Sequence, residues 1–115
     1  MNKDIIVIQI IYKIIGRTKY MTTEEKELFK RFINDDVYHN DISYKFTMKS
    51  GDVFIVKYDG EGESEINPFT GEDDYYYGFV FHIIKVLNDS SGNYCDDAFV
   101  EISKYDYPIE IMKIS

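Results

Sequence analysis

The sequence predicts an α+β domain in which two N-terminal helices pack on a four-stranded antiparallel meander sheet. Residues 22–34 have the capping and apolar spacing of a helix, and the pattern changes to period two after residue 41. Helices followed by a run of strands are typical of α+β domains with the helices on one sheet face. The chain has 115 residues, which suffices for one core and not for two, so a single domain over 1–115 is expected.

Residues 2–15 fit either a helix or a strand. Eight Ile and Val residues in this segment favour a buried strand, whereas Gln9, Lys13 and Arg17 lie four residues apart and would form one polar stripe on a helix. Gly16 could end such a helix, so a helix is the interpretation adopted, with a strand as the alternative. The apolar run is too short to cross a bilayer and no small-residue cleavage site follows it, so we expect a core element.

Residues 22–34 form the clearest predicted helix. Thr22 and Glu25 have the spacing of a capping box, and acidic residues in the first turn suit the positive end of the helix dipole. Met21 directly precedes the cap and is also a plausible alternative start of the chain. The apolar stripe of this helix consists of Leu28, Phe29, Phe32 and Ile33.

A β-hairpin is predicted next. Apolar and polar residues alternate at 44–49 and again at 53–58, and Ser-Gly at 50–51 is a good two-residue turn. Such a turn would pair Met48 with Val53 and give the hairpin one apolar face. The remaining segments are a polar loop at 34–41, a long strand from 75 or 76 to 87, a turn region at 88–97, and strands at 98–103 and 109–114, with Pro108 at a strand start or an edge.

The stretch 59–78 is the most unusual part of the chain. It contains seven carboxylates, no Lys or Arg, and three consecutive tyrosines. Four glycines and an Asn-Pro pair predict a long loop in which nothing regular persists, and such loops are usually functional or disordered. Because adjacent strand residues alternate faces, at least one of the tyrosines should be exposed. The candidate partner-binding residues are Asp59, Glu61, Glu63, Glu65, Glu72, Asp73, Asp74, Tyr75, Tyr76 and Tyr77.

No pattern in the sequence predicts catalysis, a metal site or a cofactor. A calcium loop starting at Asp59 would need Gly at its sixth position and Glu at its twelfth, where this chain has Ser64 and Thr70. Cys95 precedes two aspartates, whose negative charge disfavours a reactive thiolate. His82 lies within a predicted strand, where a histidine is more often a sheet residue than a base. We therefore expect a protein that is not an enzyme.

The charge distribution restricts the class of partner. The net charge is −8, and residues 35–115 hold seventeen acidic against six basic residues, whereas residues 1–34 hold four against seven. Such a chain should not bind a nucleic-acid backbone or an anionic membrane surface, because both require Lys and Arg. It fits a basic protein partner. The single cysteine favours a reducing, cytoplasmic location.

These observations favour a small inhibitor that binds a basic, nucleic-acid-handling protein such as a nuclease, by phosphate mimicry, with the tyrosines as anchors. In size, charge and lack of catalytic motif the chain resembles phage anti-defence proteins such as anti-CRISPR proteins. The resemblance is one of general character, and no motif matches a specific family, so it implies no functional residues. The alternatives are an immunity protein against a nuclease toxin and a non-inhibitory structural or adaptor domain, which could form a homodimer through a sheet edge.

Overall fold

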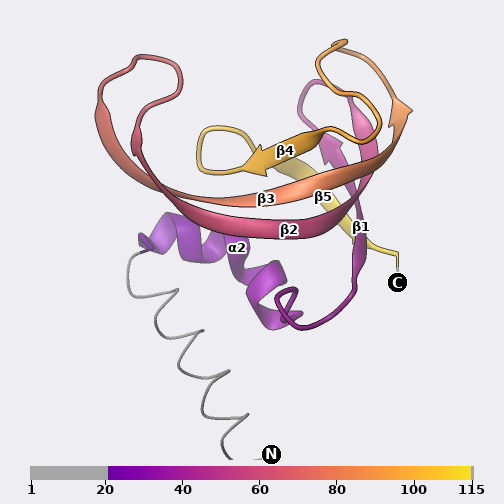
Figure 1. The fold of residues 1–115 in the computed structure, drawn as a ribbon, viewed down its shortest axis with the longest axis horizontal. Helices are drawn as coiled ribbons and strands as arrows, with labels where there is room; N and C mark the ends of the chain where they lie inside the picture. The colour runs from indigo at the N-terminus through magenta and orange to yellow at the C-terminus, as the bar shows by residue number, and fades with distance from the viewer. Residues whose placement is uncertain (1–20, 115) are drawn as a thin grey trace, which may run out of the picture.

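The computed structural model describes residues 21–114, which form one helix and one antiparallel sheet (Figure 1). The α+β class is therefore confirmed. The first predicted helix, at residues 2–15, lies outside the described residues. The elements are α2 (Thr23–Asn34), β1 (Ser43–Met48), β2 (Val53–Ile66), β3 (Asp73–Asn88), β4 (Phe99–Ile102) and β5 (Pro108–Lys113), and the strand order in the sheet is β4-β3-β2-β1-β5.

The prediction of a four-stranded meander is wrong in strand number and in connection. The sheet formed by residues 21–114 has five strands, and only β1 to β4 form a meander, because β5 returns to pair with β1 at the opposite edge. Ser103 and Asp106 form a bridge within the β4–β5 connection, which shortens the distance that this connection can span between the two strands. A flat sheet would separate the outer strands by about 19 Å. The sheet therefore curls, as β2 and β3 show in Figure 1.

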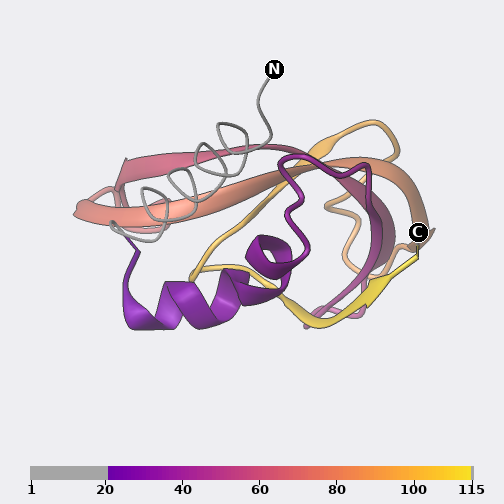
Figure 2. The same cartoon turned by 90° about the horizontal axis from the view of Figure 1, so that it is seen from below.

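Helix α2 begins and ends as the sequence predicts. The Thr22 hydroxyl accepts a hydrogen bond from the Glu25 backbone N–H, and the Glu25 carboxylate accepts one from the Thr22 N–H, which completes a capping box. Phe29 and Phe32 are fully buried and pack on rings of β3 and β1, on the side of the sheet where Figure 2 draws the helix. The Phe29 ring stacks on Phe79 with centroids 4.5 Å apart.

The core lies between this face of α2 and the sheet and consists largely of aromatic rings. Tyr44 and Phe46 of β1 are fully buried, and so is Phe81 of β3. Phe32 is at the centre of the cluster, with its ring centroid 4.9 Å from that of Phe81 and 5.3 Å from that of Tyr44. Burial, together with a hydrogen bond of 2.6 Å from its hydroxyl to Asp35, raises the pKa of Tyr44 well above its ordinary value.

The turn between β1 and β2 has three residues, 49–51, and not the two predicted. Met48 N–H donates to the Asp52 carbonyl at 2.8 Å, and Gly51 adopts a left-handed φ of +93°. The extra residue shifts the register by one, so Thr47, and not Met48 as predicted, pairs with Val53. Gly51 adopts this φ without strain because it has no side chain, and a left-handed residue at the end of the loop is typical of three-residue hairpin turns.

Asp52 joins this turn to the turn region at 88–97. Its buried carboxylate accepts hydrogen bonds from the Ser50 hydroxyl and from the backbone N–H groups of Ser90 and Ser91, the last two at 2.8 and 3.0 Å. The Ser50 hydroxyl and then the Ser91 N–H lower the pKa of Asp52 to about 2, because they stabilise the charged form.

The prediction that nothing regular persists within 59–78 is also wrong. Strand β2 continues to Ile66, and β3 begins at Asp73, so only residues 67–72 form a loop. The strand predicted from 75 or 76 to 87 is confirmed and begins earlier. The last two strands are confirmed at β4 and β5, and Pro108 is the first residue of an edge strand, as expected.

Candidate functional site: the acidic hairpin arm

Strands β2 and β3 extend together beyond their neighbours. Strand β1 pairs with β2 only as far as Lys57, and β4 pairs with β3 only from Phe79 onward, so residues 59–78 form a two-stranded projection that we call the hairpin arm. Gly62 lies opposite Gly78 and Glu63 opposite Tyr77 in its ladder. The arm is the upper left end of the long ribbon in Figure 1.

The tip of the arm is an ordered turn. The Asn67 side-chain oxygen accepts hydrogen bonds from the Phe69 and Thr70 N–H groups at 2.8 and 3.2 Å. The Asn67 N–H donates to the Glu72 carbonyl at 2.8 Å, and Gly71 adopts a φ of +73°. The glycine and the Asn-Pro pair therefore close a hairpin, whereas the sequence analysis attributed them to an irregular loop.

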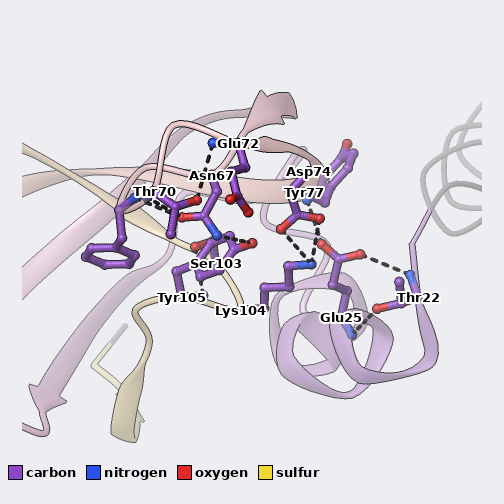
Figure 3. A network of polar contacts seen from close by, with 11 residues as sticks. Thr22, Glu25, Asn67, Thr70, Glu72, Asp74, Tyr77, Ser103, Lys104 and Tyr105 are labelled. Atoms are coloured by element: carbon purple, nitrogen blue, oxygen red, sulfur yellow. Dashed lines mark hydrogen bonds and ion pairs between the residues drawn. The ribbon is translucent and has the colours of Figure 1, made fainter.

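Helix α2 supports one face of the arm. The Tyr77 N–H donates a 2.6 Å hydrogen bond to the Glu25 carboxylate, whose other oxygen caps the helix at Thr22 (Figure 3). The Glu25 side chain is almost completely buried. The Phe29 ring packs edge-on against Tyr77 with centroids 6.2 Å apart. One carboxylate thus connects the start of the helix to the base of the arm.

The β4–β5 connection supports the opposite face. The Asn67 amide donates a 3.0 Å hydrogen bond to the Tyr105 hydroxyl, and the Tyr76 ring packs edge-on against Tyr105 with centroids 5.1 Å apart. The Lys104 ammonium lies 3.3 Å from the Asp74 carboxylate, a contact drawn in Figure 3. The two sides together hold the arm in place, although little of it is buried.

The seven carboxylates of the arm fall into two groups. Glu61 and Asp74 are half-buried, and Glu61 accepts hydrogen bonds from the hydroxyls of Tyr58 and Tyr77 at 2.6 and 2.7 Å. The others are exposed and form no ion pair with a cation of residues 21–114. These exposed carboxylates are Asp59, Glu63, Glu65, Glu72 and Asp73.

The three tyrosines have different environments. Tyr75 is 70% exposed, Tyr76 is buried, and Tyr77 is half-buried beneath the helix. The prediction that at least one is exposed is confirmed. Of the three tyrosines, Tyr75 alone presents most of its ring to solvent, because Tyr76 and Tyr77 pack within the protein.

A cavity of about 410 Å³ lies where the arm meets the start of α2. Exposed residues Glu63 and Tyr75 form part of its wall, so it opens to solvent. Sequence reasoning missed the contribution of the helix to this site, because no local pattern shows that residues 52 positions apart meet. The lining residues are Thr22, Glu25, Glu63, Tyr75, Tyr76 and Tyr77.

Three glycines of the arm differ in what surrounds them. Gly60 and Gly62 have open space where a side chain would begin, and Gly78 lies under the Glu101 side chain, 2.9 Å from where a Cβ would be. Gly78 is therefore needed for the close approach of β4, a role that the sequence analysis did not assign.

The other candidate residues do not form a catalytic arrangement. His82 Nε2 lies 3.4 Å from Asp97, and its ring packs against Phe99, as expected of a sheet residue. Cys95 is exposed and free. Within residues 21–114 no group of His, Cys, Asp and Glu side chains is arranged to hold a metal ion, and no helix there has the length and apolar character to cross a membrane.

The arm must be interpreted from its own geometry. Comparison with protein-family models, with curated proteins and with solved structures finds no match to this chain.

Proposed function

We propose that the hairpin arm is a preordered docking element for a basic protein surface, and that the protein inhibits a nucleic-acid-handling protein such as a nuclease by occupying its phosphate-binding surface. One observation carries this proposal. Five exposed carboxylates project from an ordered hairpin, and none is neutralised by a cation of the described chain. Electrostatic complementarity of this kind accelerates association and suppresses unsuitable partners.

The order of the arm supports binding over a passive surface role. A flexible acidic loop loses conformational entropy when it binds, whereas an arm already held by Glu25 and Tyr105 loses much less. The exposed Tyr75 adds a rigid amphipathic side chain beside the carboxylates. The charge and shape of the arm support a role in binding, and an inhibitor is the binding protein that we propose.

The test uses a panel of purified basic nucleases, with inhibition and association rate measured at rising salt. The triple charge reversal Asp59→Lys, Glu65→Lys and Asp73→Lys should slow association at least tenfold, because it changes the net charge by six units on the arm. Inhibition should also weaken as salt rises, since exposed charges are screened. Binding that is insensitive to both salt and charge reversal would contradict phosphate mimicry.

An anti-defence inhibitor and an immunity protein against a nuclease toxin would use the same surface. The two differ in the gene beside them, because an immunity protein is encoded next to its toxin. Phage genes around the coding sequence would favour the anti-defence assignment.

A self-associating adaptor is the second candidate, and the β5 edge favours it. Ile109, Met112 and Ile114 are exposed on or directly after this edge strand, and Ile109 is 66% exposed. The Arg31 guanidinium already donates to the Ile111 carbonyl and covers part of the edge. A salt-independent dimer in light scattering that is lost in Ile109→Lys would favour the adaptor over the inhibitor.

A further inference from the structure

The cavity between the arm and α2 has the size and walls of a binding site. Its volume of about 410 Å³ lies within the range of small-ligand pockets, roughly 300–1,000 Å³. Glu63 lies directly opposite Tyr77 in the ladder, and Tyr75 is diagonal to it on the same face. The cavity is therefore bounded by aromatic rings and by a carboxylate at its mouth.

The carboxylates of this cavity lack a cation within the described chain. Glu25 is 1% exposed and, among residues 21–114, accepts hydrogen bonds only from the N–H groups of Thr22 and Tyr77. Neither Glu25 nor Glu63 forms an ion pair with a Lys or Arg of residues 21–114, and Lys104 is paired with Asp74. A buried negative charge attracts a cation more strongly than an exposed one, because the local dielectric constant is lower.

Aromatic and carboxylate walls together favour one kind of side chain. A guanidinium stacks on a tyrosine ring and donates two parallel hydrogen bonds to a carboxylate, and its aliphatic stem packs along apolar surface. A lysine ammonium offers a point charge without the planar stacking. The 70% exposed ring of Tyr75 stands at the solvent side of the cavity, where such a side chain would enter.

We propose that this cavity is an anchor site for a single arginine side chain of the basic partner, held between the Glu63 carboxylate and the Tyr75 ring. The inference rests on the proposed function, because it identifies the site at which a side chain of the partner is bound. The rest of the arm then steers the partner, while the cavity fixes its position.

The experiment titrates the full chain, labelled with ¹⁵N, with a peptide that carries one arginine between glycines and blocked ends. Amide shifts are expected at Thr22, Glu63 and Tyr75–Tyr77, and the matched lysine peptide should give weaker shifts at the same positions. A single-cation probe isolates the cavity, since it cannot bridge several carboxylates of the arm. Shifts spread evenly over 59–74, or equal shifts with both peptides, would overturn the arginine site.

Matched variants distinguish binding of arginine in the cavity from general attraction to the carboxylates of the arm. Glu63→Gln and Tyr75→Ala should each weaken arginine-peptide binding about three- to tenfold, as expected for loss of a charge-assisted or cation–π contact. Glu65→Gln removes the same charge from the same strand outside the cavity and should change binding less than about twofold. Tyr75→Phe keeps the ring and should behave like the unmodified protein.

Two outcomes distinguish failure of the arginine site from failure of the proposed function. Equal losses in Glu63→Gln and Glu65→Gln, with none in Tyr75→Ala, would reject the cavity site and leave acidic docking by the arm intact. Failure of the charge-reversed arm to affect nuclease association would reject the proposed function, and with it the identity of the partner. Unchanged thermal unfolding of each variant confirms that the fold is retained.

Discussion

The two halves of the β2–β3 hairpin form the same ladder by different means. In the base, Phe54, Val56, Phe81 and Ile83 are fully buried under the helix and the curled sheet. In the arm, Tyr76 and Gly78 are the only buried residues, and support comes from Glu25 on one side and from Lys104 and Tyr105 on the other. Burial orders the base, whereas cross-strand pairing and a few contacts at the two sides order the arm.

This difference means that the arm and the base should respond differently to the same kind of change. Elements with few buried apolar contacts open locally at a lower free energy than the core. Removing a core side chain should therefore affect the whole protein, whereas removing a supporting contact should affect the arm alone.

The largest effect is expected from matched phenylalanine substitutions in the two regions. Phe81→Ala, in the base, should lower the free energy of unfolding by about 3–5 kcal/mol, because the ring is fully buried. Phe69→Ala, at the 75% exposed tip of the arm, should lower it by less than about 1 kcal/mol. Urea unfolding measures both, and similar losses at the two positions would contradict the division between base and arm.

Loss of the Glu25 carboxylate should loosen the arm without unfolding the base. Glu25→Ala leaves the Tyr77 N–H without its acceptor, at a cost of about 1–3 kcal/mol. Hydrogen exchange should become faster at Tyr77 and stay slow at Phe81. Glu24→Ala, in the exposed first turn, is the control. Unchanged protection at Tyr77 would show that the helix does not hold the arm.

Lowering the pH should destabilise the base of the hairpin through protonation of Asp52, and this loss of stability should be smaller than those above. Its folded pKa of about 2 lies below the ordinary value of 3.8, so between these values the unfolded chain binds more protons than the folded one. The stability that Asp52 contributes is fully present above pH 4 and is lost as the pH falls toward 2. Thermal unfolding of the wild type and Asp52→Asn should converge across this window, and parallel curves would exclude the carboxylate as the cause.

The smallest effect on stability is expected from the exposed acids of the arm. Asp59→Lys with Glu65→Lys should change the free energy of unfolding by less than about 0.5 kcal/mol, since solvated charges contribute little. Glu61 is left out because it accepts two tyrosine hydroxyls. Chemical denaturation provides the measurement, and a loss above 1 kcal/mol would mean that these carboxylates are structural.

Features fixed by neighbouring residues could be predicted from the sequence. The capping box at Thr22 and the alternation in β1 depend on residues a few positions apart, and both are present in the structure. Strand geometry predicted that at least one of the three tyrosines is exposed, and the structure shows that it is Tyr75. Local patterns therefore located the helix and the strands, but did not identify which tyrosine is exposed.

Features that depend on distant residues could not be predicted. Order in the arm comes from Glu25, 52 positions before Tyr77, and from Tyr105, 38 positions after Asn67. One local signal was available, because Asp59, Glu61, Glu63 and Glu65 occupy every second position, which is the period of a strand. Gly60 and Gly62 lie between these residues and favour a loop, so the alternation was not interpreted as a strand. The return of β5 to β1 likewise depends on sheet curvature, which has no local pattern.

Beyond Lys57 the outer edge of β2 pairs with no strand of residues 21–114. An open strand edge of this length is a template on which a second molecule can add its own strand, and repeated addition leads to aggregates. Two copies of this edge repel each other, because each carries a row of carboxylates. The charge that we propose attracts a basic partner would therefore also oppose association between copies of the protein, and conditions that protonate these carboxylates would expose the edge to self-assembly.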